Sequence, residues 1–192
     1  MARCAAIMTL TSRAWPSALV ERRSPRHLVL LGLPGAGKST VGPLVARALG
    51  RGFVDLDQEI ERRDGRSVAM IFAALGEGAF RALESEMTAA LLAKGRPPIV
   101  LAPGGGWVED PAHRALLGSV ATGVYLRVSP AVAVARMGPT TEARPLLAGG
   151  DAERKLVEVL ARREAMYVLS QHTVSVDSMT PSEVASSIVA LA

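Results

Sequence analysis

The fold of this chain is decided by residues 32–40, GLPGAGKST, which follow a short apolar run at residues 27–31 and open a helical pattern. The stretch fits the pattern G-x-x-x-x-G-K-[ST] in the strand-to-helix setting that makes it specific for phosphate-binding loops. Its glycines let backbone N–H groups turn towards a phosphate chain, and the start of the helix adds partial positive charge. The sequence therefore predicts a nucleotide-phosphate site here.

Side chains in and after this loop suit phosphoryl chemistry. Lys38 can reach the outer phosphates, and the Ser39 hydroxyl is placed to bind a phosphate-bound Mg²⁺. Asp55 and Asp57 follow a short strand, and the alternation of an extended chain predicts both carboxylates on one side, at a strand end where ligands bind. One is expected to order the metal's water shell and the other to accept a proton from an attacking hydroxyl. A plainer alternative makes Asp57 the N-cap of the next helix.

Length and composition indicate one domain without a membrane span. The chain has 192 residues and is 49% hydrophobic, and no uninterrupted apolar run approaches the roughly 20 residues that a bilayer requires. The single cysteine, Cys4, excludes an internal disulfide and a cysteine cluster for zinc. We expect a soluble, cytoplasmic protein.

The net charge of +4 belongs to the N-terminal residues. Residues 1–26 contain five arginines and one glutamate, which leaves 17 basic and 17 acidic residues in the remainder. A neutral domain without aromatics interleaved among basic residues does not favour a nucleic-acid partner. Residues 1–26 are predicted to be a basic, disordered extension, or residues upstream of the true start, preceding a P-loop domain at 27–192. Their arginine, serine and alanine content also fits an organelle transit peptide.

The remaining pattern alternates strands and helices. Buried-strand patterns occur at residues 98–102, 123–128 and 173–176. Helices are expected after the phosphate loop up to Gly50, on both sides of Gly65, from Gly76, at 132–136, at 151–169, and after a capping box at 180–183. On the helix from Gly76, Arg81 and Glu84 lie at i, i+3 and are expected to form an exposed pair.

Two segments lack periodicity and are interpreted as parts of the site. Gly104, Gly105 and Gly106 follow the strand at 98–102, and successive glycines cost backbone entropy, so they mark a close approach to the main chain. Residues 137–150 contain two prolines and two adjacent glycines, and we interpret them as a mobile lid that carries Arg144.

Over residues 27–192 the sequence resembles the shikimate kinase family of P-loop small-molecule kinases, which is related to the nucleoside monophosphate kinases. The matching stretches are GLPGAGKST (32–40), FVDLDQEIERRDGRSVAMIF (53–72), GEGAFRALESE (76–86), PGGGWV (103–108), ARPLL (143–147) and the R-x-x-x-Y of residues 163–167. The resemblance implies a three-layer α/β fold of the P-loop NTPase type, with a five-stranded parallel sheet flanked by helices and a mobile lid. It also implies a monomer that transfers the γ-phosphoryl group of MgATP to the 3-hydroxyl of shikimate.

The resemblance also implies a role for each matching residue. The nucleotide would be bound by Gly35, Ala36, Gly37, Lys38, Ser39, Thr40 and the lid residue Arg144. Ser39 and the outer-sphere Asp55 would serve the Mg²⁺, and Asp57, Lys38 and Arg144 would be catalytic, with Asp57 as the base. The shikimate would be bound by Asp57, Arg81, Gly104, Gly105, Gly106 and Arg163. In this scheme the two substrate-binding arginines grip its carboxylate, and Glu84 orients Arg81.

Departures from the family pattern keep other functions open. The bulky Trp107 directly after the glycines is expected to line and narrow the acceptor pocket, and Pro103 stands where a small or polar residue is usual. Met137 occupies the place of an arginine near the adenine, so Arg136 is the candidate to stack there. The alternatives are a kinase of another hydroxy acid or polyol, such as gluconate, and a catalytically silent relative that binds nucleotide or a partner. Catalytic silence is disfavoured because the charged lid and the substrate clamp are retained together with the catalytic residues: Lys38, Asp57, Arg81, Arg144 and Arg163.

Overall fold

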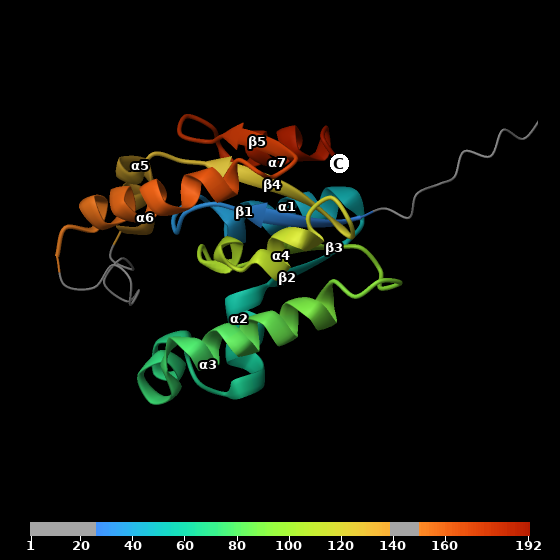
Figure 1. Cartoon of the computed structure of the whole chain (residues 1–192). Helices are drawn as coiled ribbons and strands as arrows, with labels where there is room; N and C mark the ends of the chain where they lie inside the picture. The colour runs from blue at the N-terminus through green and yellow to red at the C-terminus, as the bar shows by residue number, and fades with distance from the viewer. Residues whose placement is uncertain (1–25, 139–149) are drawn as a thin grey trace, which may run out of the picture.

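Five apolar segments form a parallel sheet with helices on both faces (Figure 1). The computed structural model describes residues 26–138 and 150–192. The central strand is buried along its whole length, as its unbroken apolar run predicts. The strand order is β2-β3-β1-β4-β5, with the bounds β1 His27–Leu31, β2 Gly52–Asp55, β3 Ile99–Ala102, β4 Ala121–Arg127 and β5 His172–Ser175.

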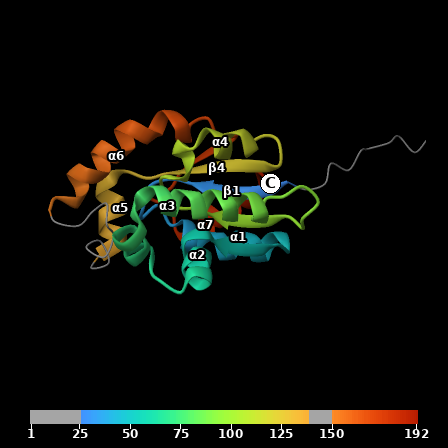
Figure 2. The same cartoon turned by 60° about the horizontal axis from the view of Figure 1, so that its bottom comes forward.

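The helices cover the sheet unequally. Helices α1 and α7 pack together on one face, α4 and α6 lie over the other (Figure 2), and α2 and α3 extend beyond the β2 edge (Figure 1). Their bounds are α1 Lys38–Leu49, α2 Leu56–Asp64, α3 Val68–Leu91, α4 Pro111–Leu116, α5 Pro130–Met137, α6 Ala152–Tyr167 and α7 Pro181–Val189, with a 3₁₀ helix, η1, at Trp107–Glu109. The three-layer α/β fold expected from the sequence is confirmed.

The carboxyl ends of strands β1, β2 and β3 lie at the same end of the sheet. Asp55 at the end of β2 pairs in register with Ala102 at the end of β3, and Val29 of β1 pairs with Leu101. The chain leaves β1 into the phosphate loop and leaves β3 into the triple glycine. Segments that are far apart in the sequence therefore meet where ligands bind in such sheets.

The predicted helix breaks are confirmed. Gly65 ends α2 in the left-handed conformation (φ 82°), and Ser67 starts α3 by accepting a hydrogen bond from the Met70 N–H. At Gly76 (φ 78°, ψ 170°) α3 is kinked, so a second helical stretch begins there, as expected. Thr180 and Glu183 form the reciprocal capping box at the start of α7.

The start of α2 differs from the prediction. Its N-cap is Asp55, whose side chain accepts a hydrogen bond from the Gln58 N–H at 3.3 Å. Asp57 is therefore neither the N-cap nor part of an extended segment. It lies in the first turn of α2, because the strand ends two residues earlier than its side-chain alternation requires.

One α-helix was not predicted from the sequence. Helix α4 begins after Asp110, whose side chain accepts a hydrogen bond from the Ala112 N–H at 2.8 Å, and Pro111 occupies its first turn. This Asp-Pro pair is a usual helix start and could have located the helix.

Trp107 does not narrow a substrate pocket, so that expectation was wrong. Its side chain is fully buried, and its indole N–H donates a hydrogen bond to the Thr88 hydroxyl of α3 at 3.0 Å. Its ring stacks on His113 of α4, with the ring centroids 4.7 Å apart. The bulky residue after the glycines therefore joins α3 to α4 in the core.

Parts of the sequence-based interpretation lie outside the described residues. These are the N-terminal extension apart from Arg26, and positions 139–149 of the lid, including Arg144. Among the residues described, no helix combines the length and apolar character needed to cross a bilayer.

We expect Thr88→Val to destabilise the protein by about 1–3 kcal/mol, because it keeps the shape of the side chain but leaves the buried Trp107 N–H without an acceptor. Urea unfolding measures the loss. In a Trp107→Phe background, which has no indole N–H, the same substitution should cost less than about 0.5 kcal/mol. An equal loss in both backgrounds would contradict this explanation.

Candidate active site

The phosphate loop is held tightly against the structure behind it. A Cβ on Gly32 (φ 140°) would lie 2.6 Å from the Leu126 carbonyl oxygen, and one on Gly35 (φ 80°) would lie 2.5 Å from the Ala133 carbonyl oxygen. Side chains at these positions would collide with backbone, and the conformations themselves favour glycine. The loop between β1 and α1 therefore has the shape that its sequence predicts.

Lys38 lies back across this loop. Its Nζ donates hydrogen bonds to the carbonyl oxygens of Gly32 at 2.8 Å and Leu33 at 3.0 Å. Helix α1 begins at Lys38, and its N-cap, Gly37, makes no side-chain cap. A cation and a helix N-terminus therefore lie together at the phosphate loop, which suits an anion.

Ser39 and Asp55 form a paired oxygen site beside the loop. The Ser39 hydroxyl donates a hydrogen bond to Asp55 Oδ2 at 2.5 Å. Hydroxyl and carboxylate oxygens are the donors that Mg²⁺ prefers, and one or two protein oxygens with phosphates and water are usual for it. The residues present therefore fit the metal expected from the sequence.

A cavity of about 610 Å³ joins these groups. It is lined on one side by residues 34–41 of the phosphate loop and α1, together with Asp55, Asp57 and Pro103–Gly105. Elsewhere it is lined by Arg136, Met137, Met179, Pro181 and Val184. Arg136 is fixed there because its Nη2 donates to the carbonyl oxygens of Val176 at 2.6 Å and Asp177 at 3.3 Å.

Each glycine after β3 touches a different functional side chain. A Cβ on Gly104 would lie 3.1 Å from Asp57 Oδ1, and one on Gly105 would lie 3.5 Å from Arg163 Nη1. A Cβ on Gly106 would lie only 2.5 Å from Arg81 Nη2. One bare stretch of backbone therefore gathers an aspartate from α2 and arginines from α3 and α6, next to the cavity that contains Lys38.

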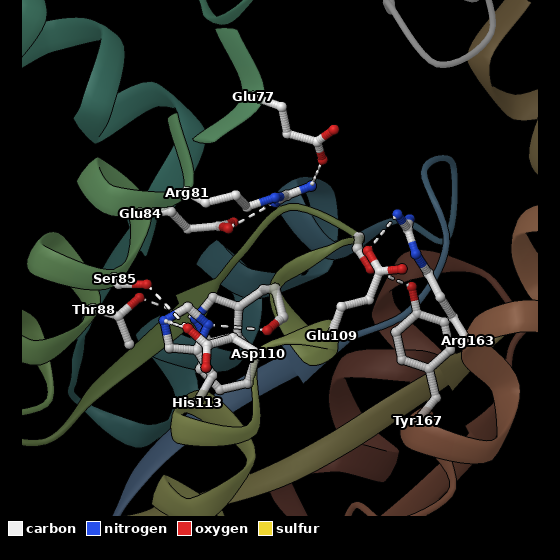
Figure 3. A network of polar contacts seen from close by, with 12 residues as sticks. Glu77, Arg81, Glu84, Ser85, Thr88, Glu109, Asp110, His113, Arg163 and Tyr167 are labelled. Carbon is white, nitrogen blue, oxygen red and sulfur yellow. Dashed lines mark hydrogen bonds and ion pairs between the residues drawn. The ribbon is translucent and has the colours of Figure 1, made fainter. Parts of the chain in front are cut away.

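Arg81 is held by two glutamates (Figure 3). Its Nη1 donates to Glu84 Oε2 at 2.7 Å, and its Nη2 donates to Glu77 Oε1 at 3.1 Å. Glu84 is only 1% exposed, so the expectation of an exposed pair was wrong. Burial raises the pKa of Glu84, against the opposing hydrogen bond and charge of Arg81.

Arg163 extends from α6 beside Glu109 and Tyr167 (Figure 3), and its side chain is almost completely buried. Its Nη2 donates to Glu109 Oε2 at 2.8 Å, whereas Nε and Nη1 have no hydrogen-bond partner in the described part of the chain. A buried charged donor without a partner is costly, so these N–H groups indicate a binding site for an anion.

Tyr167 supports this corner one helical turn later. Its hydroxyl donates to the Gly105 carbonyl oxygen at 2.6 Å, and its ring stacks on Tyr125 with the centroids 5.0 Å apart. Burial raises the pKa of the Tyr167 hydroxyl well above its ordinary value, so it remains a donor. The R-x-x-x-Y spacing thus places a guanidinium and a hydroxyl at the same glycine loop.

Sequence reasoning missed Glu109 and Tyr125. Tyr125 sits in the buried pattern of β4, and nothing in that pattern marks its contact with Tyr167. Glu109 follows the triple glycine within η1. Its closeness in sequence to those glycines was the one signal that could have marked it as a site residue.

Comparisons with known proteins agree with these features. The family model described as shikimate kinase matches residues 34–192. A shikimate kinase from Mycobacterium bovis is 48% identical over 139 residues, covering 72% of this chain and 77% of that protein. A solved shikimate kinase from Acinetobacter baumannii in complex with shikimate has a TM-score of 0.81 at 34% identity, covering 86% of this chain and 92% of that one.

A more distant structure shows how far the fold alone extends. A gluconokinase from Sinorhizobium meliloti has a TM-score of 0.55 at 19% identity, covering 88% of this chain and 92% of that one. That likeness shows a shared fold only. The family model and the closer relatives confirm the resemblance that the six sequence stretches carry, and the chain belongs to the shikimate kinase family of phosphotransferases that act on an alcohol group.

Proposed function

We propose that this protein transfers the γ-phosphoryl group of MgATP to the 3-hydroxyl of shikimate. The observation that carries the proposal is the triple glycine, which contacts Asp57, Arg81 and Arg163 from three different helices beside the phosphate loop. The complex of the Acinetobacter baumannii relative with shikimate supports the same acceptor for this chain.

The two arginines suit a carboxylate on the acceptor. A planar guanidinium can bind a carboxylate through two parallel hydrogen bonds, which a lysine cannot do. Arg81 is positioned by the buried Glu84, and Arg163 has buried N–H groups on the side of the glycine loop. Together they would fix the ring of a small hydroxy acid.

Asp57 is the proposed base. It lines the cavity together with Lys38 and Ser39, and it lies against Gly104 at the acceptor side. In this role its carboxylate orients the acceptor hydroxyl and takes its proton as the new O–P bond forms and the bond to the leaving ADP oxygen breaks.

The nucleotide side depends on the phosphate loop. Lys38 would exchange its bonds to the loop carbonyls for phosphate oxygens, and Ser39 and Asp55 would hold the Mg²⁺ directly and through water. The metal neutralises developing charge on the phosphates when bound. Arg144 lies outside the described residues, and its assignment to the lid remains a prediction, as do the monomeric state and the cytoplasmic location.

The main reason to consider an alternative acceptor no longer applies. Trp107 suggested a pocket of different shape, but its side chain is buried between α3 and α4 and does not line the cavity. A gluconate-like acid or a polyol therefore stays an outcome of the assay below, as does a silent protein that binds nucleotide without transfer.

We expect Asp57→Asn to lower kcat by about 10²- to 10⁴-fold, because the amide cannot accept the proton. A coupled ADP-release assay with MgATP and shikimate, quinate or gluconate measures the effect. Asp64→Asn, which changes a carboxylate at the other end of α2, should retain activity and serves as the control. Unchanged turnover would remove Asp57 as the base, and turnover with gluconate alone would reassign the acceptor.

We expect Arg163→Lys to raise the acceptor KM by about tenfold although it preserves the charge, because a lysine cannot form the two parallel bonds. The KM for ATP should change little. Arg162→Lys, at the adjacent exposed position of α6, provides the matched control. An unchanged acceptor KM in Arg163→Lys would count against the carboxylate clamp.

We expect Gly106→Ala to raise the acceptor KM by about tenfold or more, because the new Cβ would displace the Arg81 guanidinium by the order of 1 Å. The backbone of Gly106 (φ −86°, ψ −10°) is accessible to alanine, so the effect comes from the contact and not from strain. Gly78→Ala is the control, since a Cβ there meets nothing within 4 Å. Equal KM values in the two variants would show that Arg81 does not depend on this contact.

A further inference from the structure

The two arginines of the proposed clamp have partners of different kinds. Glu84, one of the two partners of Arg81, is 1% exposed, so its carboxylate belongs to the protein interior. Glu109, the partner of Arg163, is 38% exposed at almost the same distance, 2.8 Å against 2.7 Å. Arg81 also pairs with the exposed Glu77, but it keeps the buried Glu84 as a fixed counter-ion, whereas the counter-ion that Arg163 has among the described residues can turn into solvent.

The contact of Glu109 is also incomplete. It reaches only Nη2 of Arg163, while Nε and Nη1 have no partner among residues 26–138 and 150–192. A guanidinium has two edges through which it can bind a carboxylate with two parallel N–H groups. Both edges include Nη2. A carboxylate entering from the side of Gly105 can therefore make more hydrogen bonds than Glu109 does. Because either edge uses Nη2, it would also bring a second negative charge next to the Glu109 carboxylate, which opposes binding of both at once.

The backbone of Glu109 is fixed independently of its side chain. Its N–H donates to the Gly106 carbonyl oxygen at 2.9 Å, and its carbonyl oxygen accepts from Arg114 Nη1 at 2.9 Å. Arg114 Nη1 also donates to the Val108 carbonyl oxygen at 2.7 Å. The carboxylate of Glu109 can therefore leave Arg163 without moving the glycine loop.

We propose that Glu109 is a displaceable counter-ion of Arg163 that competes with the carboxylate of the acceptor and so limits acceptor affinity. This inference rests on the proposed function, because it requires Arg163 to bind the acceptor carboxylate. In the substrate-free protein Glu109 compensates the buried positive charge. When the acceptor binds, Glu109 turns outward, and it returns to Arg163 as the phosphorylated product leaves.

The proposal predicts that affinity for shikimate rises when Glu109 is neutralised, whereas a purely structural role for Glu109 predicts that this affinity falls. In Glu109→Gln the dissociation constant of shikimate, measured by titration calorimetry on the full chain, should fall by about threefold to fivefold, the scale of a partly exposed ion pair. The KM for shikimate should fall with it, and kcat should not rise, because the product is held more tightly. If Glu109 only positions Arg163, both constants will rise instead, which would overturn the proposal.

The neutral methyl ester of shikimate tests whether the effect of Glu109 depends on the carboxylate of the acceptor. It has no negative charge to compete with Glu109, so its KM should stay within about 1.5-fold in Glu109→Gln. An equal fall for acid and ester would overturn the proposal, because competition between carboxylates would not explain it. Glu158→Gln controls for net charge, since Glu158 is exposed on α6 and forms no ion pair among the described residues.

Failure of the proposed function would look different. If the unmodified protein binds shikimate but releases no ADP, the transfer reaction fails while the calorimetric comparison still tests Glu109. If the protein does not bind shikimate, the proposal for Glu109 is overturned as well. Glu109→Ala, which leaves no polar group, should lower the dissociation constant in the same direction as Glu109→Gln. A rise in both variants, with unfolding midpoints unchanged, would exclude the competing role.

Discussion

The site depends on a stretch of backbone that carries no side chains. Gly104, Gly105 and Gly106 leave β3 at the edge of the sheet, and each lies against a functional group from another helix. A Cβ on Gly106 would lie 2.5 Å from Arg81 Nη2, so any other residue at this position would push Arg81 away. The glycines therefore set the distance between the aspartate, the two arginines and the phosphate loop.

Gathering these charges opposes stability. Arg163 is 3% exposed and Glu84 is 1% exposed, and removing such groups from water costs more than a single partner returns. Glu84 Oε1 and two nitrogens of Arg163 have no hydrogen bond within the described ranges. A core selected only for stability would contain apolar side chains at these positions, and an anionic ligand would complete the N–H groups of Arg163 that have no partner.

Local sequence signals predict the helices and strands of this fold better than they predict the contacts between them. Gly65 and the capping box at Thr180 act within about four residues, so the sequence is enough to place those helix ends. Glu84 reads as an exposed residue because its burial depends on the glycine loop that covers it. Arg163 and Glu109 are 54 positions apart, and neither segment contains a periodicity that joins them.

The same difference divides the site into two halves. The phosphate side comes from one continuous stretch, residues 32–40, whose geometry is fixed by close contacts with β4 and α5. The proposed acceptor side is assembled from α2, α3, α6 and the glycine loop, so it exists only when the long-range packing is in place. A substitution on the acceptor side can therefore alter what is bound while the phosphate loop stays intact. Glu109, which is 38% exposed, is the proposed point of such tuning.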